Sequence, residues 1–308
     1  MRTAIIVNPR SGLTERQLTA EGSRVDRAAR WAAAQGASVE VVATTRAGHA
    51  AELAARFLAA GIERVVAWGG DGTVNEVAGP LIGSRVAVGI VPGGSGDGLA
   101  RSLGLPRDPE AAFRIALTAS PKAMDAGWLA GRHFLNIAGI GFDAEVARRF
   151  SLRHTRGTGG YIVEAMKRVW SYRCDDYRIR IGGGSGGSGG STEFSGPHFV
   201  IAFANGREYG SGLAIAPEAD PSDGWLDAVI VTGGSPLRQL WRSRRLGFRP
   251  MRPAEGVWRG RVRDASIVSI AGARLVCHVD GEPFETSGEI SLRLDPGALL
   301  VAGAGRYS

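Results

Sequence analysis

The sequence predicts two domains, a three-layer parallel α/β domain followed by an antiparallel β-sandwich domain. Apolar runs typical of buried strands alternate with helical patterns over residues 1–125, as in parallel α/β folds. Short strand-like runs separated by glycine turns dominate from residue 126 to residue 296, as in β-sandwiches. The length of 308 residues also suits two domains better than one.

The first domain is expected to contain four strands joined by helices that end at glycines. Strands are predicted at residues 3–8, 38–44, 65–68 and 85–91, and helices at about 15–35, at about 45–60 and after the third strand as far as Gly79-Pro80. The C-terminal tail, 297–308, is expected to return to this domain. In a parallel sheet the carboxyl ends of the strands lie at one edge, where binding sites gather.

The loop after the third strand, Gly69-Gly70-Asp71-Gly72-Thr73, is the stretch around which the chain is organised. Three glycines lack the Cβ atoms that would keep backbone N–H groups away from a bulky anion. Asp71 would repel phosphates unless a divalent cation or a reacting hydroxyl lay between them. From these residues alone, a tight strand-to-helix turn without a ligand explains the pattern equally well.

The second domain is expected to consist mainly of strands. They are predicted at 128–131, 134–138, 177–181, 198–205, 226–232, 266–271, 275–280 and 290–295, with helical insertions at about 159–172 and 237–247. The Gly/Ser tract 182–191 has the composition of a flexible linker and is expected to be disordered. It resembles an engineered loop replacement, and a natural glycine tract is the alternative.

Composition restricts the compartment and the partners. Two cysteines, Cys174 and Cys277, cannot build a disulfide framework, so a cytoplasmic location is expected. No apolar stretch reaches the roughly 20 residues needed to span a bilayer. The net charge of +7 favours anionic partners, namely phosphates, anionic lipid surfaces or nucleic acid.

Several motifs, in order along almost the whole chain, resemble the diacylglycerol kinase catalytic superfamily, which includes bacterial lipid kinases and sphingosine kinases. They are Asn8-Pro-x-Ser-Gly12, Thr45, Gly69-Gly-Asp-Gly-Thr-x-Asn-Glu76, the run 92–106 that begins Pro92-Gly-Gly-Ser-Gly-Asp-Gly, Asp125, the run 134–144, Ala204-Asn-Gly206, the run 219–227 and Val279-Asp-Gly-Glu-Pro283. The resemblance implies an NAD kinase/diacylglycerol kinase-like fold that binds ATP between the two domains and phosphorylates a lipid hydroxyl.

The resemblance also implies roles for individual residues. Nucleotide contacts are expected from Asn8, Ser11, Thr45, Gly69, Gly70, Asp71, Gly72, Thr73, Val74, Asn75 and Ser95. Asp71 and Asp125 would organise the catalytic Mg²⁺, and Glu282 would accept the proton of the attacking hydroxyl. Without the family, the residues favour a hairpin-turn role for Glu282, and a role as a cap or a solvated strand end for Asp125. Asp143 is expected to be a structural carboxylate near the interdomain cleft.

A second, structural Mg²⁺ is implied at the turn 220–225. Asp220 and Asp223 would bind it through their side chains and Trp225 through its backbone carbonyl, the oxygen ligands that hard cations prefer. An Asp-Gly turn without a metal is the alternative.

Asp97 departs from the family, which usually has asparagine there. An additional negative charge near the phosphates should weaken nucleotide binding unless a metal or an arginine offsets it. Asp97 and the Gly/Ser tract leave open an inactive homologue that binds lipid or nucleotide. A kinase of a soluble acceptor such as NAD also stays open, because NAD kinases share the glycine-aspartate loop.

The segment 237–252 mixes arginines with leucines, Trp241 and Phe248, which suits the surface of an anionic membrane. A solvated helix packed on the sandwich would show the same pattern. No nucleic-acid fold motif accompanies it, so no nucleic-acid partner is expected. The expected partners are a lipid substrate and, peripherally, the membrane, and a homodimer stays open.

Overall fold

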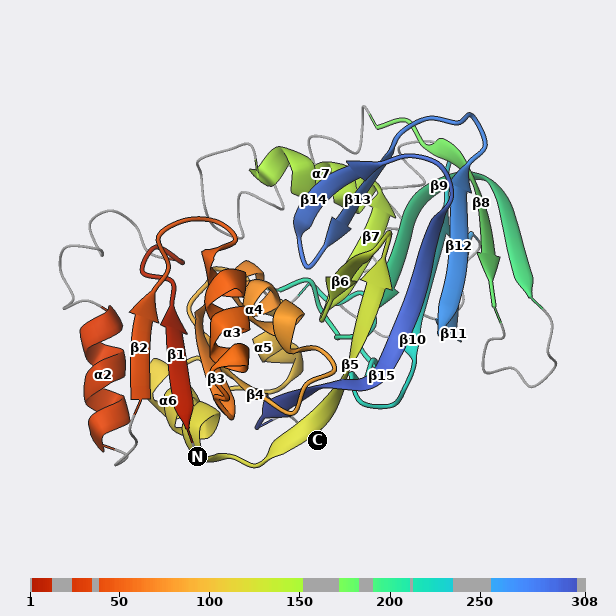
Figure 1. The fold of residues 1–308 in the computed structure, drawn as a ribbon. Coiled ribbons are helices and arrows are strands. Elements are labelled where there is room, and N and C mark those ends of the chain that lie inside the picture. Colours follow the sequence, from red (N-terminus) through yellow and green to blue (C-terminus); the bar gives the residue numbers. More distant parts are fainter. Residues whose placement is uncertain are drawn as a thin grey trace. The chain divides into compact units, whose positions relative to one another are not determined.

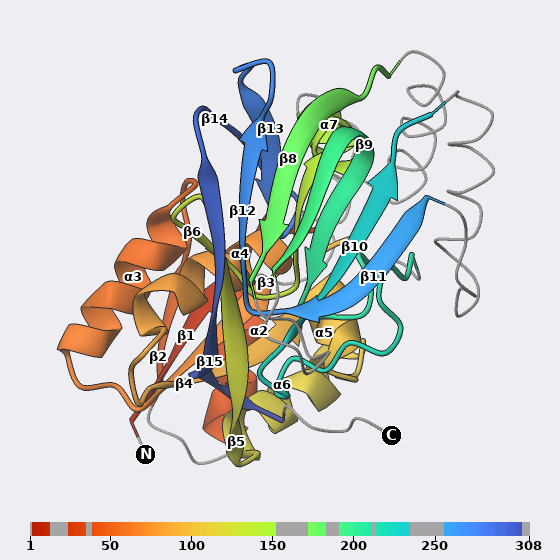
Figure 2. The ribbon, with the colours of Figure 1, turned by 90° about the vertical axis from the view of Figure 1, so that its right-hand side faces the viewer.

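The computed structural model describes residues 2–12, 24–34, 39–151, 172–182, 191–210, 213–234 and 256–303. The chain divides into two units, Met1–Met124 with Gly297–Ser308, and Asp125–Pro296. Figure 1 labels their elements, and Figure 2 gives a second view.

The first unit contains a parallel sheet. Its strands are β1 (Thr3–Val7), β2 (Val39–Ala43), β3 (Arg64–Gly69) and β4 (Ala87–Pro92), in the order β2-β1-β3-β4. The end of β15 (Ile290–Ala302) pairs with β4 in parallel through Leu300 and Val301. All residues of β1, β3 and β4 are buried, as expected for strands covered on both faces.

Helices cover both faces of this sheet. On one face, α2 (Arg24–Ala34) and α6 (Pro109–Thr118) share a core with β1 and β3, built around Trp68 and Phe113. On the other face, α3 (His49–Ala59) contacts β1 and α4 (Asp71–Ala78) contacts β3 (Figure 1). The short segments η1 (Gly79–Leu81) and α5 (Gly98–Ser102) complete the unit. The predicted three-layer arrangement is confirmed.

The second unit is built from antiparallel strands. They are β5 (Pro121–Leu129), β6 (Arg132–Phe134), β7 (Ile137–Gly141), β8 (Asp175–Ile181), β9 (Thr192–Ala204), β10 (Leu226–Thr232), β11 (Val257–Val262), β12 (Asp264–Ser269), β13 (Leu275–Val279), β14 (Glu282–Thr286) and the first part of β15. The long strand β9 pairs with β8 through its first half and with β7 and β10 through its second half. Alternate residues of these strands form one large apolar core, as in a sandwich.

Local predictions failed where a side chain interrupts the pattern. The strand expected at 134–138 is two strands, β6 and β7, because the N–H groups of Leu135 and Asn136 donate to the carboxylate of Asp280 instead. Strands β11 and β14 and helices α6 and α7 (Phe142–Ser151) were not predicted.

Three predicted segments lie largely or wholly outside the described residues. These are the helices at 159–172 and 237–247 and the Gly/Ser tract 182–191. Tyr172, the last residue of the first, is described and is not helical. Within the described ranges, no helix is both long enough and apolar enough to cross a membrane.

Candidate functional site

Three loops of the first unit meet at the carboxyl ends of β1, β3 and β4. The loops approach so closely that a Cβ on Gly70 would lie 3.1 Å from the side-chain Oγ of Ser11 and 3.2 Å from Gly94 Cα. Asn8 Nδ2 donates a 3.0 Å hydrogen bond to Thr73 Oγ1, which joins the first loop to the second. Four of the predicted nucleotide-binding positions therefore belong to one compact group of loops.

Asp71 lies in the first turn of α4, and its carboxylate is bonded to the backbone of a second loop. Its two carboxylate oxygens accept 3.1 Å hydrogen bonds from the N–H groups of Gly98 and Leu99, at the start of α5. N–H groups in the first turn of a helix have no partner within the helix, so this remote carboxylate serves as the cap of α5. The sequence placed Asp71 in the loop correctly but gave no sign of this bond.

Asp97 stabilises the third loop. It has a left-handed backbone (φ 48°), which aspartate and asparagine tolerate better than most residues, and its Oδ1 accepts a 2.9 Å hydrogen bond from Gly94 N. Burial raises the pKa of the Asp97 carboxyl, although hydrogen bonds from Gly94 and Gly93 and the charges of Arg107 and Arg24 oppose the rise. The carboxylate thus costs energy where it lies, and part of that cost is offset by its neighbours.

Arg24 is a residue that the sequence did not single out. Its guanidinium donates to the carbonyl oxygens of Asn8 (3.2 Å) and Gly93 (3.4 Å) and lies over the ring of Trp68. A cation therefore joins the first and third loops. The sequence does not indicate this role because Arg24 lies in no motif; the role follows from where the folded loops lie.

Thr45 belongs to a fourth loop, after β2. Its N–H and hydroxyl both lie 3.2 Å from Nδ1 of His49, the first residue of α3. Glu76 on α4 accepts from Gly48 N (2.9 Å) and Ala50 N (3.2 Å), so the motif residue Glu76 caps α3. This capping role was not predicted.

These loops fit a polyphosphate. Glycines at the points of closest approach leave no room for side chains, and the start of α4 carries N–H groups and a helix dipole that favour anions. Val74 is buried and its N–H donates to Gly70 O at 3.1 Å, whereas Ser95 is exposed. Gly69 ends β3, and Gly72 and Asn75 lie in α4.

Glu282 lies in the second unit, exposed at the first position of β14. The preceding residues, Asp280 (φ 48°) and Gly281 (φ 84°), form the two-residue turn of the β13–β14 hairpin. The carboxylate of Asp280 accepts hydrogen bonds from three successive N–H groups, those of residues 135–137, at 2.8–3.1 Å. Asp280 thereby anchors the turn that carries Glu282, a role that the sequence did not indicate.

The three carboxylates among the predicted metal ligands accept hydrogen bonds within the chain. Asp125 is buried, and its Oδ2 accepts from Gly224 N at 2.7 Å. Oδ1 of Asp220 accepts from the N–H and the hydroxyl of Ser222, at 3.0 and 2.7 Å. The carboxylate of Asp223 accepts from Trp225 N and forms a 3.0 Å ion pair with Arg261.

A cation at this turn would compete with Arg261 for Asp223. No group of three or more His, Cys, Asp or Glu side chains in the described parts of the chain could hold a metal ion. A site with two carboxylates and a carbonyl, as predicted at 220–225, falls below that number. Both Mg²⁺ sites therefore stay predictions.

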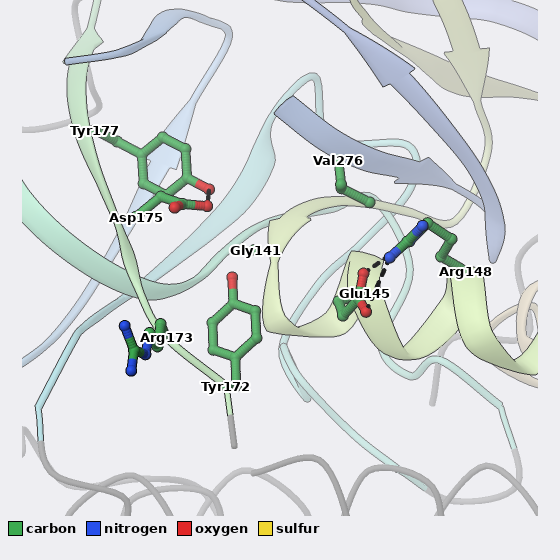
Figure 3. A pocket seen from close by; sticks show the side chains of 8 residues that line it. All are labelled: Gly141, Glu145, Arg148, Tyr172, Arg173, Asp175, Tyr177 and Val276. Atoms are coloured by element: carbon green, nitrogen blue, oxygen red, sulfur yellow. Dashed lines mark hydrogen bonds and ion pairs between the residues drawn. The ribbon is translucent and has the colours of Figure 1, made fainter. Parts of the chain in front are cut away.

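The second unit also contains a pocket of about 290 Å³. It is lined by Gly141, Glu145, Arg148, Tyr172, Arg173, Asp175, Tyr177 and Val276 (Figure 3). Glu145 is paired with Arg148 at 2.8 Å, and the hydroxyl of Tyr177 donates to Asp175 at 3.3 Å. Hydroxyls and charges of both signs suit a polar group better than an acyl chain.

Comparisons with known proteins agree with this geometry. The model of the diacylglycerol kinase catalytic domain matches residues 2–129, and that of the YegS C-terminal NAD kinase beta sandwich-like domain matches residues 136–303. The chain belongs to the YegS-like family of probable lipid kinases. The resemblance and the fold class predicted from the motifs are thereby confirmed.

Individual relatives cover much of the chain. A probable lipid kinase YegS-like from Chromohalobacter salexigens is 36% identical over 211 residues, which is 67% of this chain and 65% of that protein. This match spans just under two thirds of the relative's length. One from Pseudomonas syringae pv. tomato is 30% identical over 87% of this chain and 84% of its own. The crystal structure of a diacylglycerol kinase from Bacillus anthracis str. Sterne shares the fold, with a TM-score of 0.71, 18% identity and coverage of 98% and 96%.

Proposed function

We propose that the chain transfers the γ-phosphoryl group of ATP to a hydroxyl group of a diacylglycerol-like or sphingoid lipid, with Mg²⁺. The observation that carries the proposal is the close approach of the three glycine-containing loops at the carboxyl ends of β1, β3 and β4. Membership of the lipid-kinase family supports the acceptor class.

The phosphates of ATP are assigned to these loops and to the start of α4. Phosphoryl transfer depends mainly on positioning the phosphates and neutralising charge on the transferred group. Backbone N–H groups would serve the first purpose and Mg²⁺ the second; Asp71, whose oxygens are oriented by Gly98 and Leu99, would hold the ion. Asp125 is the second residue proposed for this ion.

Glu282 is proposed as the base. As the lipid oxygen bonds to the γ-phosphorus and the bond to the β-phosphate oxygen breaks, the carboxylate takes the hydroxyl proton and ADP leaves with the electron pair. Its exposure leaves it accessible to a substrate, and the Asp280 anchor restricts the turn beneath it. Replacing Glu282 by Gln should lower turnover by more than about tenfold, because an amide cannot take up this proton.

An acceptor panel tests the proposal. ADP release from ATP and Mg²⁺ is measured with mixed-micelle diacylglycerol, with mixed-micelle sphingoid lipid, with NAD and without acceptor. Release that requires a lipid supports the proposal; release only with NAD makes the chain a kinase of a soluble acceptor. If none of the acceptors raises ADP release above the background of the Glu282→Gln variant, the chain is an inactive homologue and the proposal is overturned.

We further propose that the enzyme acts at anionic membrane surfaces from the cytoplasm, through the basic and aromatic segment 237–252, which lies outside the described residues. Salt-sensitive binding to anionic vesicles is expected. Equal binding to neutral vesicles, or none, contradicts this part.

A further inference from the structure

A buried polar group lies under the turn that carries Glu282. His278 on β13 is 1% exposed, and its Nε2 lies 3.1 Å from Oδ2 of Asp143, at the start of α7. The same oxygen accepts a 2.9 Å hydrogen bond from the hydroxyl of Tyr209. Buried polar groups are costly unless they are paired, so this group serves either to stabilise the fold or to position the turn that carries Glu282.

The neighbouring strand makes room for this pair. Gly139 on β7 pairs with His278 in the sheet, and a Cβ there would overlap the carboxylate of Asp143 and lie 2.7 Å from Nε2 of His278. Any other residue at position 139 would displace the imidazole or the carboxylate. The space for the Asp143–His278 pair is therefore built into the sheet.

The other nitrogen of the imidazole faces the turn. Gly281 N donates to Nδ1 of His278 at 3.4 Å, and Gly281 immediately precedes Glu282. A neutral imidazole can accept through one nitrogen only while the other carries the proton. Asp143 is an acceptor, so it favours the tautomer with the proton on Nε2 and leaves Nδ1 free to accept from Gly281.

We propose that His278 is a positioning residue for Glu282, with its tautomer set by Asp143 and Tyr209. Asp280 fixes one side of the two-residue turn to residues 135–137, and His278 fixes the other side through Gly281. The inference rests on the proposed role of Glu282 as the base. A misplacement of about 1 Å can lower catalysis by about two orders of magnitude, so a second attachment of the turn affects turnover.

Two variants separate the two nitrogens. Asparagine places its amide oxygen near the position of Nδ1, so His278→Asn keeps an acceptor for Gly281 and loses the link to Asp143. Glutamine places its amide nitrogen near Nε2, so His278→Gln keeps the link to Asp143 and loses the acceptor. The matched control is His198→Gln, another buried histidine of the same unit, whose Nδ1 lies 2.7 Å from Gly196 O.

Two readouts on the full chain distinguish this inference from the proposed function. The first is kcat and KM for lipid phosphorylation; the second is amide hydrogen exchange of the peptide that contains Gly281, which needs no activity. His278→Gln should lower kcat by more than about tenfold with KM for ATP unchanged, and should speed exchange at Gly281. His278→Asn should retain kcat to within about threefold and keep the exchange slow. His198→Gln should change neither.

Equal kcat and equal exchange in His278→Gln and wild type overturn the inference, as does the reverse order of the two variants. A wild-type chain without lipid-kinase activity overturns the proposed function, and exchange alone then decides whether His278 holds the turn. Should both His278 variants unfold, Tyr209→Phe takes their place, since it removes only one donor to Asp143. Faster exchange at Gly281 in that variant supports the positioning group, and unchanged exchange rejects it.

Discussion

Replacing Asp71 by Asn tests whether the proposed catalytic carboxylate also holds the protein together. The carboxylate accepts two 3.1 Å hydrogen bonds, from Gly98 N and Leu99 N. Asparagine retains one acceptor oxygen and turns an NH₂ group toward the remaining N–H. We therefore predict that the Asn variant loses stability as well as turnover.

The size of the effect follows from the bond that is lost. A hydrogen bond to a charged group contributes about 1.5–3 kcal/mol, and a lost helix cap typically costs about 1 kcal/mol. A loss of about 1–2 kcal/mol is therefore expected. It corresponds to a drop in Tm of roughly 3–8 °C for a domain of this size.

Thermal unfolding followed by circular dichroism, without nucleotide, measures this drop. The matched control is Asp108→Asn at the start of α6, where the side chain accepts a single hydrogen bond, from Ala111 N at 2.8 Å. Asparagine caps helices about as well as aspartate, so this variant should unfold near the wild-type temperature. An Asp71→Asn variant that unfolds with the control would show that the bonds to α5 contribute no stability.

Three further predictions concern the loops and the pocket. Gly94→Ala places a Cβ 2.7 Å from Gly70 Cα, so calorimetry should show an ATP affinity at least about tenfold lower than that of the wild type. Gly96→Ala adds a Cβ that makes only ordinary contacts, so this variant should keep the wild-type Tm. Asp97→Asn should bind ATP about three- to tenfold more tightly than the wild type at neutral pH, because a nearby negative charge is removed. The ATP affinity of the wild type should rise as the pH falls toward the raised pKa of Asp97. An ATP affinity that does not change with pH would contradict this role of the Asp97 charge. Burial opposes ionisation of Glu145, but its bonds to Arg148 and Arg149 outweigh this effect and lower its pKa. Glu145→Gln should therefore be less stable than the wild type by about 1 kcal/mol at pH 7. In unfolding titrations this difference in stability should disappear as the pH falls through the lowered pKa of Glu145.

The parallel sheet and its binding edge could be predicted because their signals are local. Apolar runs of strand length, each followed by glycines or a capping residue, place the loops of residues 8–12, 69–73 and 93–98 at one edge whatever the details of packing. Helix α6 was missed although Asp108-Pro109 is a standard helix start and Phe113 and Leu117 repeat at helical spacing. The signal for this helix is therefore local as well.

Other features depend on partners that are remote in sequence. Asp71 finds its N–H partners 27 and 28 residues away, and Asp280 finds its three partners more than 140 residues away. Strand β14 begins Glu282-Pro283, a weak strand pattern that is tolerated because β14 ends the strand order of the sheet, where proline need not donate to a neighbour. Such features follow from tertiary contacts and have no local signature.

The two acidic residues of the loops differ in what they require of their side chains. Asp71 uses both oxygens on the backbone of α5, so no neutral residue of the same shape can replace it without loss. Asp97 accepts the hydrogen bond from Gly94 N through one oxygen, which asparagine also provides, and asparagine likewise tolerates a left-handed backbone. The negative charge thus contributes to stability at Asp71, whereas at Asp97 it should weaken ATP binding. Opposite responses to the same Asp→Asn change, lower stability at position 71 and tighter ATP binding at position 97, would demonstrate this difference between two carboxylates of neighbouring loops.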